Sequence, residues 1–390
     1  MPSINTVLAR LFTPGASVPP EAKASATGRL IAFHTQGNPV WTPRDYAALA
    51  REGFQKNPVV YRSVRLIAEA AASVPWLLHE GEKELDSHPF LTLLSRPNVR
   101  QAGPALMEAV FGYLLVSGNA YLEAASVDGE IRELHALRPD RMKVIPGPDG
   151  WPEAYEYTVS GRAVRFDQQQ TMPPLLHLSL FHPLDDHYGM GALEAAGTAL
   201  DLHNASAAWN KALLDNAARP SGALVYEGEG SLSLDQFDRL KKELEENYQG
   251  ATNAGRPLLL EGGLAWQAMG ISPKEMDFIE ARREAARDIA LAFGVPPMLL
   301  GIPGDNTYSN YAEANRALWR HTVLPLVGRT AQSLAHWLSP AFGEGLKLSC
   351  DMDAIDALSA DREALWARLG AASFLTDDEK RIAVGYGVRE

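Results

Sequence analysis

Apolar side chains recur at helical spacing in the first quarter of this 390-residue chain. Asn57 followed by Pro58 is typical of a helix start, and the next apolar residues share one face until Pro75: Val60, Val64, Ile67 and Ala71. Thr42 with Pro43 predicts an earlier start of the same kind. A further helix is expected from Pro104 to Gly118-Asn119, because glycine commonly ends helices.

From residue 120 the apolar period shortens toward two, which indicates strands separated by Gly, Pro and Asp turns. The expected strands cover residues 120–125, 131–137, 141–145, 155–159 and 175–180. The first half of the chain is therefore predicted to be α+β.

Long helices dominate the prediction for the second half. Residues 191–218 read as one helix with ten alanines, a composition that favours close packing against other helices. Strands at 223–227, 257–260 and 264–269 surround a charged helix at 234–248, where Ser233 and Gln236 form a capping-box pattern. A second long helix is expected from Ser272, with Pro273 first and Glu275 completing a cap, to Phe293.

The last quarter predicts a polar loop and then more helix. Residues 304–310 form that loop, and a third long helix follows that Pro325 should kink. A strand at 346–350 and two short helices complete the α+β fold, the last helix capped by Thr376 and Glu379.

Composition narrows the possible functions. The net charge of −12 argues against wrapping nucleic acid, since neutralising phosphates requires Lys and Arg. No apolar run approaches the roughly 20 residues of a membrane span, so no membrane partner is expected. The single cysteine, Cys350, fits a reducing compartment and, in a predicted strand, reads as a buried inert thiol.

The sequence contains no Walker loop, G-x-S-x-G, H-E-x-x-H or paired-cysteine zinc pattern, so we predict no catalytic residues, no cofactor and no metal. Gly189-x-Gly191 lacks the third glycine of a dinucleotide fingerprint and is better explained by a turn at a helix start. One enzymatic alternative remains, because several imidazoles and carboxylates lie close enough to bind a metal: His177, His182, Asp185, Asp186 and His187. Turn formation explains them better, since loops commonly collect His and Asp.

A series of short motifs, in order along residues 40–345, resembles the portal proteins of long-tailed (siphovirus-like) phages, prophages and gene transfer agents. The motifs are Asn57-Pro58-Val59-Val60-Tyr61-Arg62, Val74-Pro75-Trp76, His88-Pro89-Phe90, Arg96-Pro97-Asn98, Ser117-Gly118-Asn119-Ala120-Tyr121-Leu122, Leu137-Arg138-Pro139, His177, Gly189-Met190-Gly191, Arg219-Pro220-Ser221-Gly222, residues 293–301 (FGVPPMLLG) and Tyr308-Ser309-Asn310.

The resemblance implies an elongated subunit assembled as a ring of about twelve copies. Residues 13–40 are rich in Pro, Gly, Ala and Ser, so residues 1–40 are predicted to be a mobile arm. The resemblance divides the rest of the chain into a wing (41–190), a stem helix (191–218), a clip (219–271), a second stem helix (272–294), a tunnel-loop region (295–311), a wing return helix and strand (312–354) and a short crown (355–390). Its function would be a portal: a channel for double-stranded DNA packaging and ejection at one vertex of a phage-like capsid, in a particle assembled in the host cytoplasm.

The resemblance also suggests two sets of contact residues. The tunnel loop would line the DNA channel with Asp305, Asn306, Thr307, Tyr308, Ser309 and Asn310. The clip would dock partners with Lys241, Lys242, Glu245 and Glu246. The implied partners are the major capsid protein, the large subunit of the packaging terminase and a head-tail adaptor. Two alternatives stay open: a metal-dependent hydrolase using the His177–His187 loop, and a scaffold ring without DNA passage.

Overall fold

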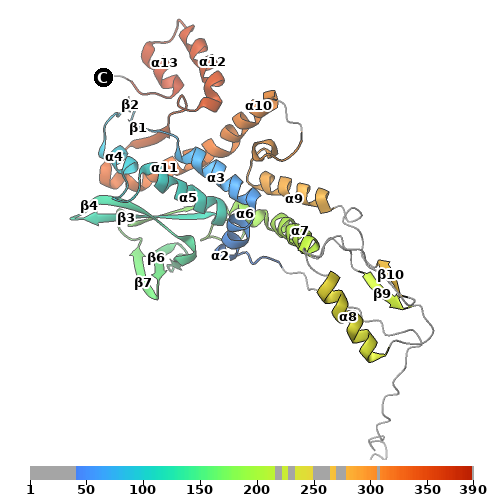
Figure 1. Cartoon of the computed structure of the whole chain (residues 1–390). Helices are drawn as coiled ribbons and strands as arrows, with labels where there is room; N and C mark the ends of the chain where they lie inside the picture. The colour runs from blue at the N-terminus through green and yellow to red at the C-terminus, as the bar shows by residue number, and fades with distance from the viewer. Residues whose placement is uncertain are drawn as a thin grey trace, which may run out of the picture. The chain divides into compact units, whose positions relative to one another are not determined.

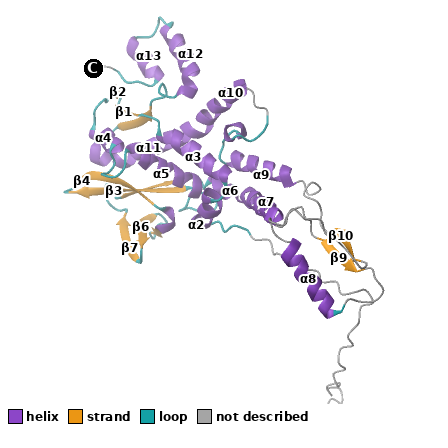
Figure 2. Ribbon diagram, viewed as in Figure 1, coloured by secondary structure: helices purple, strands orange, loops and turns teal. Residues whose placement is uncertain are grey.

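The computed structural model describes residues 41–215, 222–226, 233–248, 264–268, 278–304 and 308–388. Two compact units are present. One contains β9 (Gly222–Tyr226), α8 (Leu234–Tyr248) and β10 (Leu264–Ala268), and the other contains all remaining described elements. The fold is a mixture of helices and small sheets, as predicted (Figure 2).

The larger unit is built on helices α3 (Pro58–Ala72) and α5 (Gly103–Ser117), which pack against each other (Figure 1). Asn57 caps α3 by accepting hydrogen bonds from the backbone N–H groups of Val59 and Val60, so the predicted start is confirmed. The whole predicted stripe on α3 is buried. Gly118 ends α5 in a left-handed conformation (φ 76°), also as predicted.

The predicted helix start at Thr42 is wrong. Asp45 caps α2 (Tyr46–Leu49), which continues into a π-helical turn at Ala50–Gln55. The backbone N–H of Thr42 instead donates to the Asp201 carboxylate, whose two oxygens lie 3.2 and 3.3 Å away. A partner 159 residues away therefore outweighs the local capping pattern.

The described part of the larger unit also contains three three-stranded sheets. The first has the order β4-β3-β8, with β3 at Asn119–Val127, β4 at Glu130–Leu137 and β8 at Leu175–Ser179. The second has the order β5-β6-β7, with β5 at Met142–Pro146, β6 at Pro152–Val159 and β7 at Arg162–Asp167. All pairs within these two sheets are antiparallel. The patterns predicted every strand here except β7, most of whose side chains are exposed.

The third sheet, β11-β1-β2, joins distant parts of the chain. Strand β1 (Trp76–Glu80) pairs with β2 (Lys83–Glu84) and with β11 (Leu346–Cys350), so that Leu78 lies opposite Leu348. Only β11 was predicted. The C-terminal helices α12 (Ser359–Gly370) and α13 (Asp377–Val384) follow, and Thr376 and Glu379 form the predicted capping box of α13.

The remaining long helices depart from the prediction at two places. The alanine-rich stretch is divided at Ala196 into α6 (Ala192–Ala195) and α7 (Gly197–Asp215). The third long helix consists of α10 (Tyr308–Leu318), a π-helical turn (Trp319–Val323) and α11 (Leu324–Phe342). Pro325 lies in the first turn of α11, directly after the π-helical turn that changes the hydrogen-bond register. Within the described residues, no helix combines the length and apolarity that a membrane span requires.

Candidate channel segment and docking helix

Helix α9 (Phe278–Ala292) leads to the predicted tunnel loop; the expected start of this helix at Ser272–Glu275 lies outside the described residues. Gly294 (φ 66°) ends the helix, and a short 3-10 turn at Pro297–Leu300 follows. Gly301 (φ 72°) then reverses the chain, and glycine is needed there because other residues rarely adopt that backbone conformation. Ile302 is buried against Ala286 and Ala290 of α9.

Two residues of the predicted loop region lie against the Arg287 side chain of α9. The Arg287 guanidinium donates a hydrogen bond of 2.5 Å to the carbonyl of Pro303. A Cβ added to Gly304 would lie 2.8 Å from the same guanidinium nitrogen. The Pro303 carbonyl is therefore hydrogen-bonded to α9, and Gly304 lies beside the same side chain.

The far end of the predicted loop is helical. Tyr308, Ser309 and Asn310 form the first turn of α10, which corrects their prediction as loop residues. The apolar residues that follow, Tyr311, Ala314 and Leu318, repeat at helical spacing, but the polar composition of the stretch obscured where that period begins. Asp305, Asn306 and Thr307 lie outside the described residues.

The helical residues after this segment form side-chain contacts with the end of α9 and with α12. Thr322, in the π-helical turn, donates a 2.8 Å hydrogen bond to the carbonyl of Gly294 at the end of α9. Arg316 of α10 and Arg320 of the π-helical turn form ion pairs with Asp361 of α12. We use "channel segment" for residues 303–310, and both of its ends attach to the frame formed by α9 and the helix that follows.

The alanine-rich helix α7 packs against α9 (Figure 1). Among the described residues of α7, Leu200, His203 and Ser206 are buried. The Asn57 side chain donates to His203 Nδ1 (3.0 Å) and to the Asn204 amide oxygen (2.9 Å), which joins the start of α3 to α7. Burial, and secondly the Arg282 guanidinium of α9, lowers the pKa of His203, so the imidazole stays neutral.

Helix α8 carries the predicted docking residues. Ser233 and Gln236 form the predicted capping box: the backbone N–H of Ser233 donates to the Gln236 side chain (3.0 Å), and the backbone N–H of Gln236 donates to Ser233 Oγ (3.3 Å). Lys241 and Lys242 are exposed, whereas the side chains of Glu245 and Glu246 lie outside the described set. The predicted strand at 257–260 also lies outside the described residues, and β10 confirms the strand predicted after it.

Three of the five residues of the hydrolase alternative have side-chain contacts that explain their positions: His177, His182 and Asp185. His182 Nδ1 accepts a hydrogen bond from the Leu184 N–H, and the Asp185 carboxylate accepts two from His187 and Tyr188, so both side chains close turns. His177 lies in β8, stacked on Tyr121 with ring centroids 4.3 Å apart. Burial lowers the pKa of His177 to about 4. Among the described residues no group of three or more His, Cys, Asp or Glu could hold a metal ion.

The lone cysteine lies at the end of β11 and is half-buried. Burial raises the pKa of the Cys350 thiol, which keeps it protonated and poorly nucleophilic.

A junction that the sequence did not predict connects β3, β8 and the loop before α6. The Asn119 amide oxygen accepts from the Gly189 N–H (2.7 Å) and from His177 Nε2 (2.9 Å), and its amide nitrogen donates to the carbonyls of Ser117 and Gly189. A Cβ on Gly189 would lie 2.2 Å from the Gly118 carbonyl oxygen. Two motifs that carried the resemblance, at residues 117–122 and 189–191, thus meet here and build the fold.

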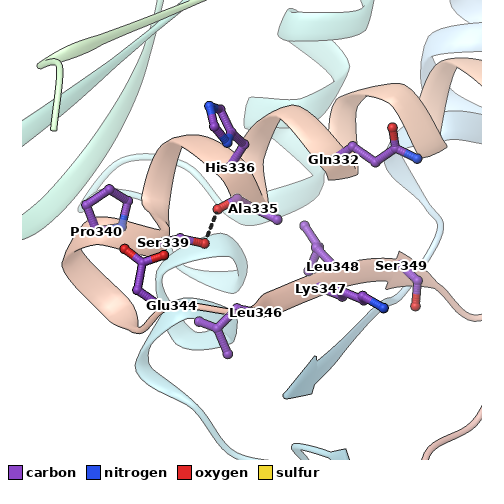
Figure 3. A pocket seen from close by; sticks show the side chains of 11 residues that line it. Gln332, Ala335, His336, Ser339, Pro340, Glu344, Leu346, Lys347, Leu348 and Ser349 are labelled. Atoms are coloured by element: carbon purple, nitrogen blue, oxygen red, sulfur yellow. Dashed lines mark hydrogen bonds between the residues drawn. The ribbon is translucent and has the colours of Figure 1, made fainter. Parts of the chain in front are cut away.

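A groove of about 670 Å³ lies between α11 and β11 (Figure 3). Gln332, His336 and Ser339 of α11 line one wall, and Leu346 and Leu348 of β11 line the other. The Ser339 hydroxyl donates to the carbonyl of Ala335, within its own helix. Of the predicted channel and docking residues whose side chains the structure describes, none lines this groove.

Comparison with known proteins gives one consistent result. A model of the family described as "Phage portal protein" matches residues 58–385. Over 339 residues, 86% of this chain and 88% of the relative, an uncharacterized protein of Rickettsia bellii is 44% identical. The portal protein of Enterobacteria phage HK97 is 26% identical over 83% of this chain and 77% of its own length.

Solved structures extend the comparison to assembled particles. A chain in the neck of an empty gene transfer agent particle, computed with C6 symmetry, has a TM-score of 0.71 and is 55% identical over 90% of this chain and 96% of that chain. In the neck of the native particle, computed with C12 symmetry, the identity and coverage are the same and the TM-score is 0.68.

Proposed function

This chain belongs to the phage portal protein family, and from that premise we propose that about twelve copies form the ring through which double-stranded DNA enters and leaves a particle of the gene transfer agent type. Its role is that of a portal-vertex protein in the neck of a phage-like particle. The observation that carries the proposal is the 55% identity over 90% of the chain to a neck subunit. The family is structural rather than enzymatic.

The channel segment supplies the proposed contact with DNA. After Pro303, Gly304 and the acidic Asp305, its residues from Asn306 to Asn310 are polar and carry no formal charge. Uncharged groups can form brief hydrogen bonds to phosphates, whereas lysines add a salt-dependent attraction at every contact. The net charge of −12 per chain would also keep DNA from adhering to the ring. The sequence contains no nucleotide loop, so a separate terminase ATPase would drive packaging.

Helix α8 is the proposed docking element for the terminase and, later, for the head-tail adaptor. Lys241 and Lys242 are exposed on a helix that belongs to its own compact unit. The major capsid protein would contact the ring elsewhere.

A double substitution in the channel segment tests the proposed function. Asn306→Lys with Thr307→Lys should leave ring assembly intact and lower the yield of DNA-filled particles, because the added charges grip the phosphate backbone. Filled and empty particles are counted after nuclease treatment. Normal filling by the double variant would show that the segment does not touch moving DNA.

A further inference from the structure

The C-terminal helices α12 and α13 bury few of their own side chains. All residues of both helices are described, and one residue in each is buried: Arg362 in α12 (8% exposed) and Val384 in α13 (3% exposed). Helices in proteins are stabilised mainly by the apolar surface that they bury against the rest of the fold. This pair therefore needs other contacts to hold it on the larger unit.

A network of hydrogen bonds around one carboxylate supplies part of that attachment. The Arg362 guanidinium donates to both oxygens of Asp353 (2.6 and 2.7 Å), which follows β11, and to the carbonyl of Val384 (2.7 Å) at the end of α13. The indole N–H of Trp366 and the hydroxyl of Tyr386 donate to the same carboxylate at 3.1 and 2.8 Å. These hydrogen bonds, that of Arg362 above all, lower the pKa of Asp353 to about 2, so the carboxylate is charged at neutral pH.

The chain then returns from α13 to the edge of the β11-β1-β2 sheet (Figure 1). The backbone N–H of Val388 donates to the carbonyl of Glu82 (2.8 Å), and Val388 forms an isolated parallel bridge with β2. The backbone N–H of Gly387 donates to the Glu84 carboxylate (3.1 Å). A Cβ on Gly387 would lie 2.3 Å from the Glu84 backbone nitrogen, so the close approach requires glycine. We call residues 386–388 the C-terminal strap.

The ion pairs of α12 with the preceding helices are more exposed than this network. Asp361 pairs with Arg316 of α10 and with Arg320 of the π-helical turn. The side chains of Asp361 and Arg320 are 31% and 50% exposed. Ion pairs with this much solvent contact contribute little to stability. The Asp353 network and the strap are therefore the stronger attachments of the two helices.

We propose that the C-terminal strap is a conformational device: it closes α12 and α13 onto the β11-β1-β2 sheet, and its opening releases both helices together while the sheet stays folded. The two helices could then change position without any refolding of the larger unit. This inference goes beyond the proposed function, because it does not depend on DNA passage.

Amide hydrogen exchange of the purified protein tests the strap, with Gly387→Ala compared with Gly370→Ala. The first substitution forces the strap away from the backbone of β2, whereas a Cβ on Gly370, at the end of α12, meets nothing within 4 Å. The amides of α13 should exchange about tenfold faster or more in Gly387→Ala, because the release of these helices becomes easier, and should not exchange faster in Gly370→Ala. The amides of β1 and β11 should be unaffected by either substitution.

A second pair of variants separates the strap from the exposed ion pairs. Tyr386→Phe removes a hydroxyl that donates to Asp353 and keeps the ring, so exchange in α13 should become about tenfold faster, as expected for the loss of a hydrogen bond to a charged group. Asp361→Asn removes the ion pairs with Arg316 and Arg320 and should change exchange in α13 by less than about twofold.

Three results would overturn the strap. The first is unchanged exchange in α13 for both Gly387→Ala and Tyr386→Phe, and the second is an equal acceleration by Asp361→Asn. The third is acceleration of β1 and β11 together with α13, which would mean that the helices open only when the sheet unfolds. DNA filling is not among the readouts, so the strap and the proposed function can fail independently.

Discussion

The junction around Asn119 and the docking helix α8 use polar residues in opposite ways. At the junction, the Asn119 amide is buried, and its hydrogen bonds go to the backbone of Ser117 and Gly189 and to His177. On α8, Lys241 and Lys242 face outward. Buried polar groups need internal partners, so the hydrogen bonds of Asn119 fix the fold, whereas the two lysines lie at the surface of α8.

The motifs that carried the resemblance include residues that the fold itself requires. Gly118, Asn119 and Gly189 belong to motifs that carried the resemblance, and each is required by close backbone packing or by the hydrogen bonds of the junction. The residues proposed to contact DNA or partners lie in stretches that have polar composition and no such packing requirement. Similarity to the family therefore indicates the fold more directly than it indicates the surfaces that contact DNA or partners.

The largest expected effect comes from filling the junction. Gly189→Ala would place a Cβ 2.2 Å from the Gly118 carbonyl oxygen and 2.5 Å from the Leu180 nitrogen, and backbone atoms cannot move aside. We expect a loss of about 4 kcal/mol or more in the free energy of unfolding. Gly112→Ala in α5 is the control, because its Cβ meets nothing within 4 Å. Equal urea midpoints for both variants would disprove the tight junction.

Acid should weaken the same junction by a somewhat smaller amount. Because burial lowers the pKa of His177 to about 4, from 6.5, the folded protein keeps the imidazole neutral. Its contribution is complete above pH 6.5 and is lost as the pH falls toward 4, about 3 kcal/mol in all. His177→Gln should remove this part of the pH dependence of unfolding. Identical profiles for wild type and variant would contradict it.

A bulky residue on α7 should affect assembly rather than the single chain. Ala208 is exposed in the subunit, and we predict that it faces a neighbouring copy. Ala208→Leu should then overpack that contact at a cost of about 1–3 kcal/mol and reduce ring formation in light scattering. Ala312→Leu, at an exposed position on α10, serves as the control. Normal rings from Ala208→Leu would mean that α7 does not pack against a neighbour there.

The smallest effect on stability is expected from α8. Reversing both lysines, Lys241→Glu with Lys242→Glu, should change the free energy of unfolding by less than about 0.5 kcal/mol, since exposed charges contribute little. The same variant should bind the terminase and adaptor more weakly in a pull-down. Undiminished capture of both partners would count against α8 as the docking element.

Local signals predicted much of this fold. Asn57-Pro58, Ser233 with Gln236, and Thr376 with Glu379 each cap the expected helix, because capping depends on neighbours in sequence. Contacts between distant residues were not predictable in this way. Examples are the pairing of β1 with β11 and the Thr42–Asp201 hydrogen bond that displaced the expected first cap.

The candidate site was predicted less completely than the fold. The tunnel-loop stretch was recognised from its composition, but its polar residues hid the start of α10 at Tyr308. In the sequence Arg287 is one of several charged residues in the stretch that forms α9. Its contact with Pro303, sixteen residues later, depends on the turn at Gly301. Such a contact could not be predicted from sequence spacing, because it forms only when the turn brings residues 287 and 303 together.

Native mass spectrometry of the purified protein tests the central claim most directly. The portal assignment predicts a closed ring of about 510 kDa, twelve times the 42.4 kDa chain, with no bound metal. A monomer or dimer that carries one metal ion per chain would contradict it.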